Sequence, residues 1–241
     1  MDYVKGIFKN RPNRFIAEVE VDGELEIAHV PNTGRCKELL VENATVWLEP
    51  SDNPKRKTKF SLHFVENRGE LVSIYSQEAN SIVFDAIKKG QIKELCGYDY
   101  HQREKTVDNS RIDIYLANEA DDCCGMTFLE KPCFVEVKGV TLVVGSEARF
   151  PDAPTERGTK HLKELIKLKK DGFRCVVFFL IQHPLGKSFR PNWENDPTFS
   201  ETLNEAYENG VEILVYSCDN QLEDIKLIPE AIDFDLSKPV D

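Results

Sequence analysis

No apolar segment of this sequence is long enough to cross a membrane. The longest uninterrupted apolar run is CVVFFLI at residues 175–181, whereas a membrane-spanning helix needs about 20 such residues. The sequence also lacks a C-x-x-C pair, although it contains seven cysteines. An odd number of cysteines without that spacing, and with no signal peptide before them, predicts reduced thiols in a cytoplasmic protein with no membrane partner.

The adjacent Cys123 and Cys124 lie in an acidic segment, EADDCCG. A zinc knuckle needs spaced cysteines together with histidine, so this pair does not predict a structural metal site. With 241 residues, of which 41% are hydrophobic, the chain is large enough to bury a core without disulfides.

Basic residues are scarce near the C-terminus. The net charge is −11, and residues 194–241 alone contain thirteen acidic and two basic residues. The remainder is therefore neutral overall, with basic clusters at residues 54–59 and 149–170. Distant acids are screened beyond about 8–10 Å, so such clusters are able to hold phosphate groups. Taken alone, each cluster is equally well explained as a solvent-exposed basic surface that binds no phosphate.

The first 79 residues are predicted to form a small closed barrel of the OB type. Apolar and acidic residues alternate on both sides of Asp22-Gly23, which is typical of a β-hairpin. A short helix is expected at residues 34–40, and a second hairpin around residues 67–69. Together the pattern predicts five strands, at residues 15–21, 24–30, 45–51, 61–66 and 71–76.

Residues 80–241 are predicted to form a mixed α/β domain. Helical spacing begins after Asn80 or Ser81, either of which suits an N-cap. The remaining pattern predicts strands, a basic helix ending at Gly172, a continuous apolar strand buried on both faces, a helix that starts at Asp196-Pro197 and a last strand. These elements are expected at residues 100–107, 111–117, 134–144, 155–171, 176–182, 196–210 and 211–217.

Two acidic residues are expected to face each other across the strands at 100–107 and 111–117. A two-residue turn at Asp108-Asn109 pairs Val107 with Ser110. Counting outward from that pair places Glu104 opposite Asp113, with Cβ atoms about 4.5–5.5 Å apart.

The stretch FVEVKG, residues 134–139, adds a third acid and a lysine. Glu136 and Lys138 share one face of this strand, while Val135 and Val137 share the other. If this strand pairs with its predecessor, Glu104, Asp113 and Glu136 converge and repel one another unless a cation lies among them. Asp113 and Glu136 offer oxygen ligands that suit Mg²⁺ or Mn²⁺, and Lys138 would orient a water. The alternative is a structural ion-pair network.

The pattern of an aspartate followed by E-x-K, on a β-hairpin after a helix, resembles the PD-(D/E)xK nuclease superfamily. Six further blocks resemble the sugar fermentation stimulation protein A (SfsA) family over nearly the whole chain: HVPNTGRCKELL, NPKRKT, SRIDIYL, EVKGVTL, FPDAPTERGTKHLKEL and GVEILVYSC. The sequence departs from the family at Cys36, Gly139 and Pro154, where methionine, serine and valine are usual.

This resemblance implies an α/β (α+β) protein with an OB-like N-terminal domain at 1–79 and a nuclease-like C-terminal domain at 80–241. It also implies DNA binding and a regulatory role in sugar metabolism. The active-site residues that it implies are Glu104, Asp113, Glu136 and Lys138.

Further residues are candidates for binding. Gln182 ends the buried apolar strand and either positions substrate or a metal-bound water, or is simply a polar strand end. Phe15 and Trp47 either stack on bases or belong to the core. Basic and polar groups on the barrel and on the basic helix, whose N-terminus attracts phosphate, are expected to contact nucleic acid: Arg14, His29, Asn32, Arg35, Arg56, Lys57, Arg111, Arg157, Lys160 and His161.

The sequence therefore predicts a DNA-binding protein with a metal-dependent phosphodiesterase site. One alternative is a regulator of sugar metabolism genes that binds DNA without cleaving it and keeps the nuclease fold for its surface. Another is a structural protein whose acidic C-terminal region contacts a partner. A homodimer is expected only by analogy with nucleases that cut two strands.

Overall fold

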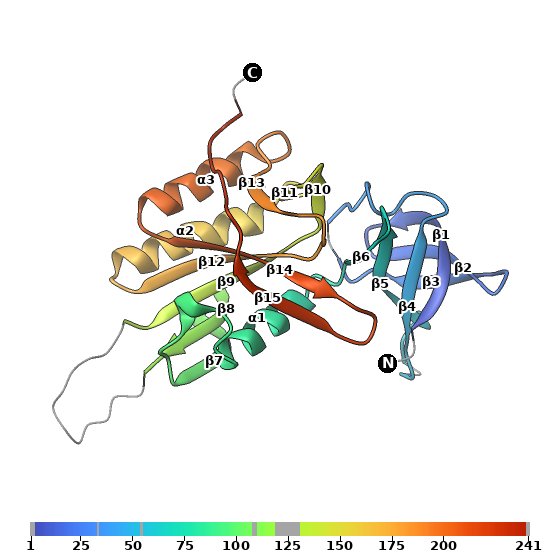
Figure 1. Cartoon of the computed structure of the whole chain (residues 1–241), viewed down its shortest axis with the longest axis horizontal. Coiled ribbons are helices and arrows are strands. Elements are labelled where there is room, and N and C mark those ends of the chain that lie inside the picture. Colours follow the sequence, from blue (N-terminus) through green and yellow to red (C-terminus); the bar gives the residue numbers. More distant parts are fainter. Residues whose placement is uncertain (1–2, 33, 54, 108–109, 119–130, 240–241) are drawn as a thin grey trace.

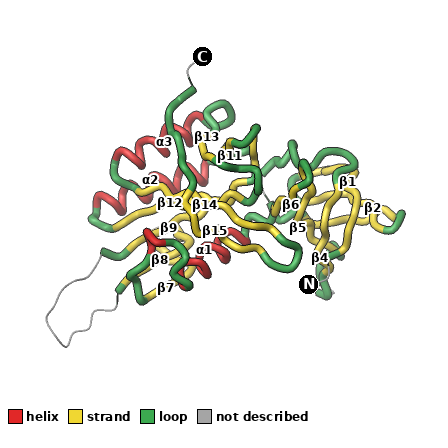
Figure 2. The backbone as a smooth tube through the Cα atoms, in the orientation of Figure 1, coloured by secondary structure: helices red, strands yellow, loops and turns green. Residues whose placement is uncertain are grey.

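The computed structural model describes residues 3–32, 34–53, 55–107, 110–118 and 131–239. The expected turn at Asp108-Asn109 and the Cys123-Cys124 pair lie outside these ranges. A small β-barrel and a larger mixed α/β domain lie side by side (Figures 1 and 2).

The barrel consists of β1 (Val4–Asn13), β2 (Ile16–Val21), β3 (Glu24–His29), β4 (Thr45–Pro50) and β5 (Phe60–Asn67). Its strand order is β3-β2-β1-β4-β5, and β3 pairs with β5 to close it. β6 (Glu70–Ser73) extends the sheet beyond β5. Positive φ angles at Asp22 (52°), Gly23 (84°), Arg68 (51°) and Gly69 (81°) fit tight hairpin turns and confirm both predicted hairpins.

Three expectations for the barrel were wrong. The fifth expected strand, at residues 71–76, corresponds to β6, which ends at Ser73 and lies beyond β5, outside the closed barrel. β1 was not predicted, because Lys, Asn, Arg and Pro interrupt the alternation of apolar and polar residues in its sequence. Only Gly6 and Phe8 of this strand are buried. The helix expected at residues 34–40 is instead a turn, in which the amides of Leu39 and Leu40 both bond to the carbonyl of Cys36. Cys36 has a φ of +46°, which no right-handed helix accommodates.

The central sheet of the larger domain has the order β15-β14-β12-β9-β8-β7. β7, β8 and β9 are antiparallel neighbours, whereas β9, β12 and β14 are parallel. β12 lies in the middle, and residues 175–181 are fully buried, as expected for an apolar strand covered on both faces. The strands are β7 (Tyr100–Val107), β8 (Ser110–Ala117), β9 (Cys133–Val140), β12 (Arg174–Ile181), β14 (Glu212–Asn220) and β15 (Ile225–Ala231).

Helices cover both faces of this sheet. α1 (Glu78–Lys88) packs on β8 and β9 from one side, and α2 (Glu156–Lys170) packs on β12 from the other, with α3 (Pro197–Glu208) beside it (Figure 1). A short 3₁₀ helix, η1 (Lys93–Leu95), follows α1. The side chain of Asp196 caps α3 as predicted, and the side chain of Thr155, where the basic helix was expected to begin, caps α2.

The N-cap predicted for α1 was wrong. The helix begins at Glu78, two residues before Asn80, and Gln77 precedes it without a side-chain cap. The side chain of Asn80 donates to Asp113 instead.

The apolar stretch at residues 134–144 divides between two sheets, contrary to the single strand expected. β9 ends at Val140, where the amide of Gln182 bonds to its carbonyl. β10 (Leu142–Val144) then pairs with β11 (Glu147–Phe150), which pairs with β13 (Ser188–Pro191) in a separate small sheet. β11, β13 and β15 were not predicted, because they are short or bury few apolar residues.

Buried polar contacts join the barrel to the larger domain. The side-chain amide of Gln182 donates to Ser73 Oγ (3.2 Å) and to the carbonyl of Tyr75 (3.3 Å). Asn220 Nδ2 donates to the carbonyl of Leu71 (2.8 Å), and the amide of Cys36 donates to Asp152 Oδ2 (3.0 Å). These contacts fix the two parts relative to each other.

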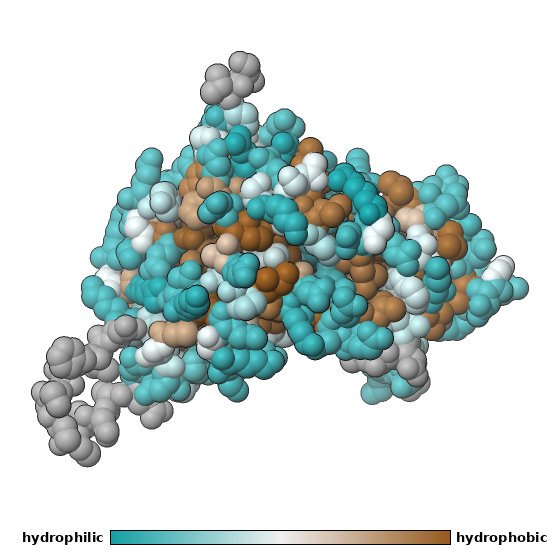
Figure 3. All heavy atoms as spheres, viewed as in Figure 1, coloured by the Kyte–Doolittle hydropathy of each residue, from teal (hydrophilic) through white to brown (hydrophobic). Residues whose placement is uncertain are grey.

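Hydrophobic atoms are visible toward the middle of the face in Figure 3, and hydrophilic atoms dominate its periphery. Among the described residues, no helix combines the length and apolar character needed to cross a membrane.

Candidate active site

The strand register places Asp113 between Glu104 and Glu136, as the sequence predicts. Arg103 pairs with Ile114 and Lys105 with Ile112, so Glu104 lies opposite Asp113. On the other side of β8, Ile114 pairs with Val135, and the next position along brings Asp113 opposite Glu136. Because the alternation of Ile112, Ile114 and Leu116 buries one set of side chains, this register follows from burial of the apolar residues.

Glu104 does not converge with the other two acids. Its φ of +57° redirects its side chain, which is 59% exposed and pairs with Arg111 at 3.4 Å. Of the titrating groups near Asp113, Glu136 is the acid that raises its pKa. The expected cluster of three carboxylates is therefore a pair, and no group of three or more His, Cys, Asp or Glu side chains in the described part of the chain is placed to hold a metal.

In the described part of the chain, two hydrogen bonds hold Asp113. Asn80 Nδ2 donates to its Oδ1 (2.7 Å), and the backbone amide of Val137 donates to its Oδ2 (2.9 Å). Burial, followed by the charge of Glu136, raises the pKa of Asp113 to about 6, although both hydrogen bonds and Lys138 oppose the shift. The carboxylate is thus fixed in orientation and readily accepts a proton or another cation.

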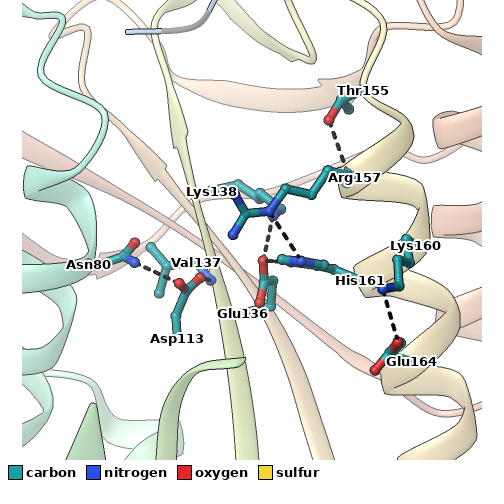
Figure 4. A network of polar contacts seen from close by, with 11 residues as sticks. Asn80, Asp113, Glu136, Val137, Lys138, Thr155, Arg157, Lys160, His161 and Glu164 are labelled. Carbon is teal, nitrogen blue, oxygen red and sulfur yellow. Dashed lines mark hydrogen bonds and ion pairs between the residues drawn. The ribbon is translucent and has the colours of Figure 1, made fainter. Parts of the chain in front are cut away.

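Glu136 is almost completely buried, with 2% of its side chain exposed. Lys138 Nζ donates to its Oε1 at 2.6 Å, and His161 Nδ1 bonds to the same oxygen. Burial alone would raise the pKa of Glu136, but the charge of Lys138 and the hydrogen bond from His161 outweigh it and lower the pKa. Figure 4 shows Glu136 on the side of His161 and Asp113 on the side of Asn80.

The protonation of His161 follows from its partners. Arg157 Nε donates to His161 Nε2 (3.4 Å), and a guanidinium is only ever a donor. Nε2 therefore accepts, and the proton of the neutral ring lies on Nδ1, which donates to Glu136. His161 positions the buried carboxylate.

His161 was predicted to lie on a phosphate-binding helix face, and this expectation is corrected by its burial at 6% exposure. It shares the inner face of α2 with Leu165 and Leu168, at helical spacings of four and three residues. That spacing was a signal for burial in the sequence. Arg157 and Lys160 are exposed on the same helix, with Lys160 3.9 Å from Glu164.

The site fits a hard divalent cation. Glu136 Oε2 is buried and, within the described residues, has no hydrogen-bond partner. Such an atom is costly to bury unless a cation or an ordered donor completes its coordination. Mg²⁺ is commonly held by only one or two carboxylates, with water and phosphate oxygens filling the remaining positions. Asp113 and Glu136 are a suitable pair of ligands.

Gln182 does not reach the surface. It is completely buried, and its side-chain amide binds Ser73 and the carbonyl of Tyr75. Its Oε1 lies so close to Gly139 that a Cβ there would overlap it. The structure thus favours the structural role for Gln182, at the junction between the domains.

A residue that sequence reasoning missed, Arg11, organises the barrel loops. Its guanidinium donates to the carbonyls of Arg35 (2.5 Å), Arg14 (2.7 Å) and Asn32 (3.0 Å). The guanidinium of Arg14 lies 4.7 Å from the centre of the Phe15 ring, and Phe15 is 44% exposed.

Trp47 is half-buried and donates to Glu66, so neither it nor Phe15 belongs to the core. Arg56 donates to Ser61 Oγ (2.9 Å) and its charge contributes to the lowered pKa of the half-buried His29, after burial. Lys57 is exposed.

Residues 77–224 match the family described as "Sugar fermentation stimulation protein RE domain", and residues 10–74 match "SfsA N-terminal OB domain". The chain belongs to the SfsA family. A "Sugar fermentation stimulation protein homolog" of Methanobrevibacter smithii is 77% identical over 238 residues, which cover 99% of this chain and 100% of the relative. A homolog of the same name from Caldanaerobacter subterraneus is 49% identical over 216 residues, or 90% of each chain.

A solved structure of this family has the same fold. The structure of Pyrococcus furiosus SfsA in complex with Ca²⁺ superposes with a TM-score of 0.86 at 30% sequence identity, covering 97% of this chain and 96% of that one. The predicted OB-type barrel followed by a mixed α/β domain is confirmed.

Proposed function

We propose that this SfsA protein is a DNA-binding phosphodiesterase that depends on a divalent metal ion. The observation that carries the proposal is the buried, unpartnered Oε2 of Glu136, on a carboxylate that also lies beside Asp113 and Lys138. The two acids and the lysine lie just beyond the paired residues of β8 and β9. Such a set of side chains suits the hydrolysis of a phosphate ester.

Asp113 and Glu136 would hold Mg²⁺ or Mn²⁺. The Ca²⁺ described for the Pyrococcus furiosus neighbour is also a hard ion that prefers oxygen ligands. When bound, the metal supplies Lewis-acid activation of a water and neutralises charge on the phosphate.

The other residues orient these groups and stabilise charge. Lys138, with 14% of its side chain exposed, presents a positive charge where negative charge develops on the phosphate in the transition state. Asn80 and the amide of Val137 fix the direction of the Asp113 oxygens. His161 does the same for Glu136 and keeps Oε2 as the oxygen left for a ligand.

The alternative function is that of a regulator that binds DNA without cleaving it. The observation in its favour is Glu104, which pairs with Arg111 and leaves the site with two carboxylates rather than three. The name shared by the relatives, which refers to stimulation of sugar fermentation, is compatible with such a role.

One experiment separates the two functions. Purified protein is incubated with single-stranded, double-stranded and branched DNA in Mg²⁺ or Mn²⁺, beside the variants Asp113→Asn, Glu136→Gln and Lys138→Met. Lys226→Ala is the control, because Lys226 is 74% exposed and pairs only with the nearby Asp224 among the ion pairs of the described residues. Cleavage lost in all three variants and kept in the control supports the enzyme. Binding by the wild type without cleavage supports the regulator.

A further inference from the structure

Two cavities flank the candidate active site, one on each side. The first, of about 630 Å³, is lined by Asp113. The second, of about 350 Å³, lies at the junction of the two domains and is lined by Lys138. Val137 also lines the second cavity, and its backbone amide donates to Asp113 Oδ2 at 2.9 Å. Residues that line the two cavities are therefore in direct contact at the site.

The same connecting segment borders both cavities. Tyr75 and Gln77, which lead from the barrel into α1, line the first, and Ser76 between them lines the second. The first cavity thus extends from β7 and β8 to this segment, and the second extends from this segment to the barrel loops.

Basic side chains line both cavities. Arg103, Arg111 and Arg157 line the first cavity, together with the acids Glu78, Glu104 and Asp113. Arg111 is paired with Glu104 at 3.4 Å, while the guanidinium of Arg103 lies over the ring of Phe84.

More basic than acidic side chains line the second cavity. The basic ones are Arg14, Lys138, which is paired with Glu136, and Arg149, which is paired with Glu147. Among its described lining residues the acid is Asp152, which accepts from the amide of Cys36. Arg14 lies over the exposed ring of Phe15. Guanidinium groups with an adjacent aromatic ring are the combination that binds the phosphates and bases of a single strand.

The second cavity is too small to hold a duplex, and polar contacts join its walls. A volume of about 350 Å³ is at the lower end of pockets that hold one small ligand. The bond from Cys36 to Asp152 ties the barrel loop to the far wall, and Gln182 ties Ser73 to the sheet. Opening the junction would leave these buried polar groups unpaired.

We propose that the two cavities form one groove that binds a single strand of nucleic acid across the active site, with the strand leaving past Arg14 and Phe15 of the barrel. This inference rests on the proposed phosphodiesterase function and specifies its substrate. The barrel then acts as a guide for one strand, and a blunt duplex has to be opened before its phosphates reach Lys138.

The test compares three substrates of one sequence in Mn²⁺: a single strand, a blunt duplex, and a duplex with a single-stranded tail. Cleavage of the single strand and of the tail is expected to be at least tenfold faster than cleavage of the blunt duplex. Ala153→Trp, which fills the second cavity from its wall, is expected to slow cleavage of the single strand at least tenfold. Leu25→Trp adds the same side chain at an exposed barrel position and serves as its control.

Binding is measured separately by fluorescence anisotropy, with Lys138→Met as the background so that the strand stays intact. Arg14→Glu is expected to weaken single-strand binding about tenfold relative to Lys226→Ala, and it tests the groove without added bulk. Thermal unfolding identifies any variant that fails to fold.

The outcomes distinguish the two proposals. A wild type that binds Mn²⁺ but cleaves none of the substrates overturns the phosphodiesterase function. The anisotropy measurements of single-strand binding then test the groove by themselves. A blunt duplex cleaved as fast as the single strand, with Ala153→Trp as active as Leu25→Trp, overturns the groove and leaves the phosphodiesterase intact. Equal binding by Arg14→Glu and Lys226→Ala also overturns the groove.

Discussion

His161 on α2 donates a hydrogen bond from Nδ1 to the carboxylate of Glu136 on β9, and both side chains are buried. This contact crosses from a helix to the strand that carries the E-x-K motif. It fixes which oxygen of Glu136 is occupied by protein donors and which is left for a ligand.

Replacing His161 by phenylalanine tests this positioning. His161→Phe keeps an aromatic ring but removes the donor. Of the partners of Glu136 in the described residues, Lys138 then remains, and Glu136 becomes easier to protonate. Mn²⁺ affinity is expected to fall about 10- to 100-fold, the range typical of partners that orient metal ligands. Isothermal titration calorimetry measures it, and His101→Phe on β7 is the matched control. Unchanged affinity in His161→Phe would contradict the positioning role.

The raised pKa of Asp113 makes its contribution to the free energy of unfolding decrease as pH rises. Its pKa is about 6 in the folded protein against 3.8 ordinarily, so the folded state binds the proton more tightly than the unfolded state. The stabilisation from this proton is complete below pH 3.8 and is lost as pH rises through 6. Without metal, Asp113→Asn is expected to be more stable than the wild type at pH 7.5 by on the order of 2 kcal/mol.

Differential scanning calorimetry at pH 5 and 7.5 checks this prediction. The advantage of Asp113→Asn is expected to shrink by roughly half at pH 5, because pH 5 lies between the two pKa values. It is expected to reverse when saturating Mn²⁺ stabilises the wild type alone. A wild type that is more stable than the variant at pH 7.5 without metal would show that the charge of Asp113 is compensated in the folded state.

Lys138 is expected to act on the chemical step rather than on metal binding. Lys138→Met keeps the apolar part of the side chain and removes the charge, so cleavage is expected to fall about 100-fold or more while DNA binding changes far less. Single-turnover cleavage and anisotropy separate the two quantities. Parallel losses in both would assign Lys138 to binding alone.

Replacing Glu104 tests whether two or three carboxylates bind the metal ion. Its side chain is exposed and paired with Arg111, so Glu104→Gln is expected to change Mn²⁺ affinity less than threefold. Glu136→Gln, its matched counterpart, is expected to abolish measurable binding because it removes a buried ligand charge. If both variants lose metal equally, Glu104 moves into the site when the metal binds.

Gly139 and Gln182 form a coupled pair at the junction. A serine or alanine at Gly139 would overlap Gln182 Oε1, so Gly139→Ser is expected to cost about 1–3 kcal/mol of unfolding free energy. Gln182→Ala in the same chain is expected to recover part of that loss. Urea unfolding of the two single variants and the double variant measures the coupling, and purely additive effects would rule it out.

The local pattern of the sequence determined the elements and the register of the site. Alternating Ile112, Ile114 and Leu116 fixed the face of β8, and so brought Asp113 opposite both Glu104 and Glu136. Thr155, Asp196, Gly172 and Gly210 marked the helix ends, because caps and left-handed turns depend on neighbours in the chain.

Only the tertiary structure decided how the side chains at those positions are used. Asn80 donates a hydrogen bond to Asp113 instead of capping a helix, and His161 bonds to Glu136 instead of contacting a phosphate. Glu104 forms an ion pair with Arg111. Each of these contacts joins residues from separate elements or depends on an unusual φ angle, and neither is encoded by spacing along the chain. Burial sets the charge state of a side chain only after helices have packed on the sheet, so the electrostatics of this site belong to the fold.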